Sequence, residues 1–288
     1  MSEDRPLINV DLGDITKPAV VLIEKISDAI GAVFLPSQIK RIAQAEAEAG
    51  KIRALGAIKI SDIQKRALFR MIHQEEKRQK NIEQIIKLAI QDLRPDAKPE
   101  DLGNDWLAHF FDKSQIVSDA EMQSLWGKLL AREANDPRTF SRRTVELVST
   151  LGRDDALLFT DLCKFGWSIE AGLSPVIYDK ALPIYQTQGI NFGTLTHLDD
   201  IGLITFNDLT NFKRMEYPKK VIVAYYGRRV EIEFSKEAGN DLKLGKVMMT
   251  QVGAELSSIC RSTPADGFFD YVRTTWEGYG YRLSLPPG

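Results

Sequence analysis

Histidine, cysteine and carboxylate side chains are the groups in this sequence that could bind a metal ion or act in acid–base catalysis. The three histidines, His73, His109 and His197, lie far apart in the chain, and the first begins HQEE rather than HExxH. The two cysteines, Cys163 and Cys260, lie in apolar segments without a CxxC pair. We therefore expect no metal site, a structural role for each histidine, and two buried reduced thiols.

Phosphate-binding and nucleophile motifs are missing from the sequence as well. It contains no GxxxxGK[ST], GxGxxG or GxSxG segment. Adjacent acids occur at 75–76, 154–155 and 199–200. Neighbouring residues on a helix point about 100° apart, so such pairs seldom converge on one substrate atom. We expect no catalytic residue and no cofactor, and we expect that the protein is not an enzyme.

The composition is that of a folded protein. The chain has 288 residues, enough for about two domains, and 43% hydrophobic with 27% charged residues argues against disorder. A net charge of −2 gives no overall attraction to nucleic acid, so such binding would need a local basic patch. Neither a signal peptide nor a membrane-spanning run is recognisable, which predicts a cytoplasmic protein, with peripheral contact at the inner membrane as an alternative.

The N-terminal half has the apolar spacing of helices. After a flexible leader at 1–15, the pattern predicts a helical bundle over 16–165. Its first helix, at 16–36, has a broad apolar face and few lysines or arginines. That face could pack inside the bundle or lie on a membrane, and burial against neighbouring helices is the more common arrangement.

Three further signals organise the predicted bundle. An alanine-rich helix is expected at 37–56, and a longer helix at 61–93 contains the polar run HQEEKRQKN at 73–81. Either one helix spans a solvated middle, or two helices pack at different angles. Later in the chain, Ser118 followed by Glu121 predicts a capping box at a helix start.

The segment 166–288 is predicted to be α+β. A helix at 191–203, a polar loop and two strands on either side of Gly227 follow the element order of a winged-helix-like domain. Basic residues cluster around the candidate wing, namely Lys213, Arg214, Lys219, Lys220, Arg228 and Arg229. They could contact phosphates or a protein partner. The helix at 191–203 contains Asp199 and Asp200 and no basic residue, which favours the protein partner.

The run from DWLAHFFD to TVELVSTLG resembles a bacterial family that is known only as a domain of unknown function, and it is similar to the related abortive-infection-alpha proteins. The matching positions are Trp106, Phe110, Phe111, Ser118, Glu121, Met122, Gln123, Trp126, Leu130, Glu133, Phe140, Ser141, Arg143 and Thr144. The chain departs from the family pattern at Arg132 and at Arg138, where glycines are usual. The resemblance implies no active site and an association with defence against phage.

These motif residues make sense as a scaffold. The aromatic residues would pack a helix pair, while Gln123, Glu133 and Arg143 could form one polar clasp across the turn that follows. Our leading hypothesis is therefore a non-enzymatic bacterial defence protein that acts through oligomerisation, a protein partner or the membrane surface. A nucleic-acid-binding or regulatory protein is the alternative. An enzyme site built from dispersed residues such as Asp161 is not favoured by their spacing.

Overall fold

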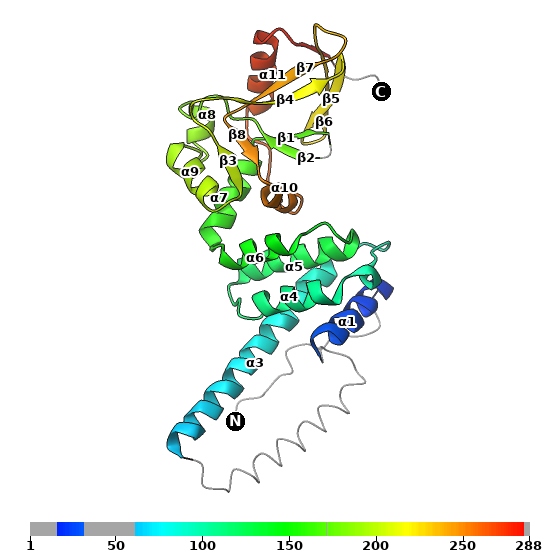
Figure 1. Cartoon of the computed structure of the whole chain (residues 1–288), viewed down its shortest axis with the longest axis vertical. Coiled ribbons are helices and arrows are strands. Elements are labelled where there is room, and N and C mark those ends of the chain that lie inside the picture. Colours follow the sequence, from blue (N-terminus) through cyan, green and yellow to red (C-terminus); the bar gives the residue numbers. More distant parts are fainter. Residues whose placement is uncertain (1–15, 32–60, 171, 285–288) are drawn as a thin grey trace. The chain divides into compact units, whose positions relative to one another are not determined.

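The computed structural model describes residues 16–31, 61–170 and 172–284 (Figure 1). Two compact units divide the chain between Ser149 and Thr150. The first strand begins at Gly166. The last helix of the predicted bundle, Arg153–Cys163, lies in the second unit. The expected leader at 1–15 and the expected helix at 37–56 lie outside the described residues.

The first unit is built from helices. They are α1 (Lys17–Ile30), α3 (Asp62–Gln91), the 3-10 helix η3 (Pro99–Asp101), α4 (Asn104–Ser114), α5 (Ala120–Asn135) and α6 (Arg142–Thr150). The C-terminal half of α3 packs along α5, and α1 packs on α4 and η3. Leu22 and Ile26 of α1 are fully buried. The sequence left open whether the apolar face of 16–36 contacts a membrane. In the described part of this segment, that face is buried against the other helices of the bundle.

The helix α3 is continuous over its 30 residues, which confirms the single-helix interpretation. Its N-terminus is capped by Ser61, whose side chain accepts a hydrogen bond from the amide of Gln64, and the Gln64 side chain accepts one from the amide of Ser61. Most side chains from 62 to 80 are exposed, and burial begins at Asn81. At about 1.5 Å per residue, this exposed part of α3 is roughly 28 Å long, and it extends beyond the other helices of the unit (Figure 1).

The second unit combines short helices with small antiparallel sheets. Its helices are α7 (Arg153–Cys163), α8 (Pro183–Gln186), α9 (Phe192–Asp200), α10 (Gln251–Ser257) and α11 (Phe268–Gly278). Its strands are β1 (Gly166–Ile169), β2 (Gly172–Pro175), β3 (Ile204–Phe206), β4 (Phe212–Tyr217), β5 (Lys220–Tyr225), β6 (Arg228–Glu233), β7 (Asn240–Gly245), β8 (Val247–Met249) and β9 (Arg282–Ser284). The mainly helical first part and the α+β second part agree with the predicted fold class.

A five-stranded sheet with the order β2-β1-β5-β6-β9 forms the main layer of the second unit. The β5–β6 hairpin turns at Tyr226 and Gly227, whose φ angles of 46° and 83° suit a tight hairpin turn. Trp167 of β1 stacks on Phe269 and meets the edge of Trp276, both from α11. These aromatic contacts attach α11 to the sheet.

Three expectations about elements need correction. The helix expected to begin with a Ser118 capping box begins one residue later, because Asp119 is the N-cap and accepts from the amides of Glu121 and Met122. The polar loop before the hairpin contains β4, which pairs with β7. No winged-helix domain is identified in the described residues, since β5 and β6 are inner strands of the five-stranded sheet.

Gly127 of α5 is the point of closest approach to α3. A Cβ atom at this position would lie 2.7 Å from Cβ of Leu88 and 3.3 Å from the backbone nitrogen of Ala89. A side chain there would therefore push the two helices apart.

We predict that Gly127→Ala lowers the free energy of unfolding by about 1–3 kcal/mol, because the clash outweighs the gain of about 1 kcal/mol in helix propensity. Gly278→Ala is the control, since a Cβ atom there meets no atom within 4 Å. Urea unfolding of both variants measures the difference. Equal stability of the two variants would contradict the tight α3–α5 contact.

Candidate functional site

The aromatic residues of the family motif form one buried cluster in the first unit. Trp106 stacks on Phe110 with ring centroids 5.2 Å apart, and Phe110 meets the edges of Phe111 and Trp126. The indole nitrogen of Trp106 donates to the carbonyl of Phe140, 3.0 Å away. The cluster therefore joins α4, α5 and the turn after α5, as a scaffold would.

Glu133 is buried at the end of α5 and holds that turn. One carboxylate oxygen accepts from the amide of Arg138 at 2.7 Å, and the other accepts from the amide of Phe140 at 2.8 Å. Arg138 has a φ of 71°, in the left-handed region that favours glycine. With both oxygens engaged by the backbone, Glu133 acts as a structural anchor.

The remaining polar motif residues do not form the single clasp that the sequence indicated. Gln123 donates to Asn81 and to the carbonyl of Val117, so it connects α3 to the segment before α5. Ser141 accepts from the amide of Thr144 at the start of α6. Arg143 is exposed. The motif therefore places its polar groups at separate joints of the first unit.

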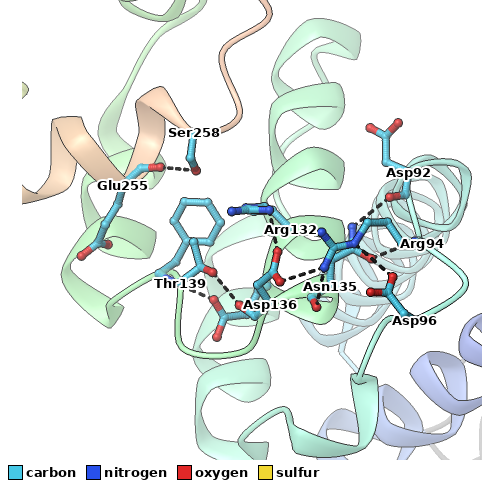
Figure 2. A network of polar contacts seen from close by, with 11 residues as sticks. Asp92, Arg94, Asp96, Arg132, Asn135, Asp136, Thr139, Glu255 and Ser258 are labelled. Atoms are coloured by element: carbon cyan, nitrogen blue, oxygen red, sulfur yellow. Dashed lines mark hydrogen bonds and ion pairs between the residues drawn. The ribbon is translucent and has the colours of Figure 1, made fainter. Parts of the chain in front are cut away.

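An ion-pair network lies at the C-terminal end of α5 (Figure 2). Asp136 accepts from Arg94 at 2.8 Å and from Arg132 at 2.5 Å. The hydrogen bond with Arg94 is the main cause that holds the pKa of Asp136 below its ordinary value. Asn135 accepts from the amide of Arg94 and donates to the carbonyl of Asp92. This network ties the end of α3 to the end of α5.

The histidines do not meet. His73 is exposed on α3, His109 lies 3.5 Å from Glu146, and His197 lies 2.6 Å from Asp155. The bond with His197 is the main cause that lowers the pKa of Asp155. Among the described residues there is no group of three or more histidine, cysteine or acidic side chains that could hold a metal ion.

The six basic residues of the candidate wing are divided between two sheets. Lys213 and Arg214 belong to β4, whereas Lys220, Arg228 and Arg229 belong to the hairpin of the larger sheet, with Lys219 just before it. Four of them form ion pairs, namely Lys213 with Asp241 at 2.6 Å, Arg214 with Glu170 at 2.9 Å, Lys219 with Glu237 at 2.7 Å and Lys220 with Glu231 at 2.7 Å.

The fifth basic residue of this group, Arg228, lies over the ring of Phe269 with its guanidinium carbon 3.6 Å from the centroid. Arg229 is exposed on β6. Since acids neutralise four of the six charges locally, the surface offers a nucleic-acid backbone much less positive charge than the sequence indicated.

Among the described residues of the first unit, most of the large exposed apolar side chains lie in the segment Asp62–Ile72, which we call the α3 tip. Its large apolar side chains are exposed, with accessible fractions of 68% for Ile63, 73% for Phe69, 54% for Met71 and 53% for Ile72. Ile63, Ala67 and Met71 recur every four residues and so share one face of the helix. By the same periodicity, that face continues into the buried residues Ile82 and Ile85 of the packed half.

The α3 tip also carries positive charge. Lys65, Arg66 and Arg70 against Asp62 give it a net charge of +2. The next two turns are stabilised in solvent by ion pairs within the helix, Arg78 with Glu75 at 2.5 Å and Lys80 with Glu76 at 2.6 Å. The sequence predicts a helix over this segment, but the helical pattern alone does not indicate that its first half is exposed.

We predict that Glu133→Ala lowers the free energy of unfolding by about 2–5 kcal/mol, because it leaves two turn amides without an acceptor and opens a cavity. Glu24→Ala, an exposed position on α1, is the matched control.

Arg138→Gly should stabilise the fold by up to about 1 kcal/mol, because glycine adopts the left-handed backbone without strain. Calorimetry compares the three, and a stable Glu133→Ala variant would refute the anchor.

Comparison with known proteins assigns a family to most of this chain. Residues 65–273 match a family model described as "Protein of unknown function (DUF2806)". No curated protein and no solved structure matches the chain. The match runs from the α3 tip to α11 and covers well over half of the sequence, so this chain belongs to the DUF2806 family of proteins of unknown function.

Proposed function

We propose that this chain is a non-enzymatic bacterial defence protein that docks on an anionic membrane surface through the α3 tip. The observation that carries the docking proposal is the exposed apolar stripe of the tip beside a basic face. A helix of this kind lies in the interface of a bilayer, with its apolar side chains among the acyl chains and its lysines and arginines at the headgroups. The defence setting rests on the resemblance of the aromatic motif to abortive-infection-alpha proteins.

The energies favour docking at such a surface. Removing an exposed isoleucine, phenylalanine or methionine side chain from water is worth about 1.5–3 kcal/mol. Each lysine or arginine near an anionic leaflet adds about 1 kcal/mol. Ile63, Met71 and Ile72 lie on one half of the helix surface, whereas Phe69 lies among the basic residues. Three exposed apolar side chains and the basic residues of the tip therefore supply enough free energy for reversible binding, after the loss of translational freedom.

Charge distinguishes a membrane from a second copy of the chain as the occupant. The exposed part of α3, residues 62–80, has six basic and three acidic residues, so its net charge is +3. Two such helices side by side would repel each other, whereas an anionic surface attracts each of them. Among the helices in the described part of the chain, none is long and apolar enough to span a bilayer. The proposed contact is therefore peripheral.

The polar motif residues support a role without catalysis. The carboxylate of Glu133 is occupied by backbone amides, and Asp136 is held between two arginines. These groups stabilise the first unit, which carries the α3 tip.

We predict that the full chain sediments with vesicles rich in phosphatidylglycerol and only weakly with phosphatidylcholine vesicles, and that added salt weakens the binding. The double variant Ile63→Gln, Met71→Gln should lose roughly tenfold or more in affinity, since two apolar contacts are removed. Ile116→Gln with Leu209→Gln, two exposed apolar positions outside the tip, is the matched control.

Equal binding by the tip variant and the control variant would contradict docking through the α3 tip. If the wild-type chain ignores anionic vesicles but forms a dimer that the tip variant cannot form, a second copy is the occupant and the membrane proposal fails. Light scattering of the wild-type chain and the tip variant without vesicles measures the molar mass and so distinguishes a monomer from a dimer.

A separate experiment tests the defence setting. A panel of phages should form fewer plaques on bacteria that carry the chain with its native gene neighbourhood than on bacteria with empty vector. The tip variant should restore plaque formation. Vesicle binding without protection from any phage would reject the defence role and leave the docking surface intact.

A further inference from the structure

The two cysteines, far apart in sequence, meet in the second unit. Cys163 is the last residue of α7 and is buried. Cys260 follows α10 and is half-buried, whereas the sequence predicted a buried thiol. Cys260 lies close enough to Cys163 to be the main cause that raises the pKa of its thiol. Since the chain has only these two cysteines, each is the sole thiol available to the other.

The surroundings of Tyr226 support this placement independently. Its hydroxyl group donates to the carbonyl of Cys163 at 3.4 Å and lies 2.5 Å from the side-chain oxygen of Ser262. The nearby amide of Ala265 donates to the hydroxyl of Tyr225 at 2.8 Å. The coil after α10 is thereby held at the C-terminal end of α7.

We propose that Cys163 and Cys260 form a peroxide-responsive dithiol that closes to an intramolecular disulfide. The pair would be a redox site in the second unit, separate from the α3 tip and independent of the function proposed above. Closing the bond requires the two sulfur atoms to approach to about 2 Å, and Tyr226 favours this by holding the coil after α10 against the end of α7.

The order of events follows from accessibility. Cys260 is partly accessible to solvent, so its thiolate is the group that attacks hydrogen peroxide, and the products are a Cys260 sulfenic acid and hydroxide. The sulfur of Cys163 then attacks the sulfenyl sulfur, and a second hydroxide leaves. The two thiol protons convert both hydroxides to water. In total, two thiols and one peroxide give one disulfide and two waters, with two electrons passing from sulfur to oxygen.

Burial explains why Cys163 is the second thiol. The hydrogen bond with Cys260 and the loss of solvation raise the pKa of Cys163 well above its ordinary value. Cys163 therefore stays protonated at neutral pH and does not react with peroxide by itself. It reacts only when the sulfenic acid forms beside it.

The test uses the reduced full-length chain, treated with increasing hydrogen peroxide and then denatured for intact mass measurement. We expect a monomer about 2 Da lighter with no free thiol, restored by a reductant, and a reversible rise in the thermal midpoint, because the bond closes a long loop. In Cys163→Ser, a dimedone label should accumulate on Cys260. In Cys260→Ser, Cys163 should remain a thiol.

The mass and the number of free thiols of the wild-type chain show whether an intramolecular disulfide forms, even if one of the variants does not fold. Peroxide treatment that leaves both thiols free, converts Cys260 to sulfinic acid without a crosslink, or yields only disulfides between two chains would overturn the proposal. Peptide mapping of the oxidised monomer identifies the crosslinked pair directly.

Discussion

The continuity of α3 is the constraint on which the rest of the first unit depends. Each backbone amide of a helix bonds to the carbonyl four residues earlier, so order in the packed half extends into the half that no other described element covers. The capping box at Ser61 and the pairs within the helix at Glu75 and Glu76 hold the free end against fraying. An apolar stripe that would normally be buried is thereby held in solvent.

Buried polar side chains support this arrangement. Asn81 marks the residue where α3 enters the bundle, and it bonds to Gln123 and to the carbonyl of Gln115. At the other end, Asn135 accepts from the amide of Arg94 just after α3. Amide side chains thus fix both ends of the packed half of α3.

Local signals were predictable from the sequence, whereas long-range pairings were not. The hairpin around Gly227 is present as predicted, and like the caps at Ser61 and Thr250 it depends on residues within a few positions. Asp119 replaced Ser118 as a cap because both residue types suit that position. The strand β4 was missed because only one of its six residues is buried, and its order comes from backbone pairing with the distant β7.

The candidate sites show the same limit. The basic residues near the hairpin looked like a phosphate-binding surface, but acids far along the chain, such as Glu170 for Arg214, neutralise them. Helical periodicity identified Ile63 and Met71 as one face and could not tell whether another element covers it. The meeting of Cys163 with Cys260 likewise depends on the fold of the whole second unit.

Hydrogen–deuterium exchange along α3, with and without phosphatidylglycerol vesicles, tests most directly whether the tip is a docking element. In the free chain, amides at 62–80 should exchange faster than those at 81–91, because only the second half is packed. Vesicles should slow exchange at 62–72 and leave 81–91 unchanged. Equal protection of both halves in the free chain, or no change at 62–72 on vesicles, would contradict the account.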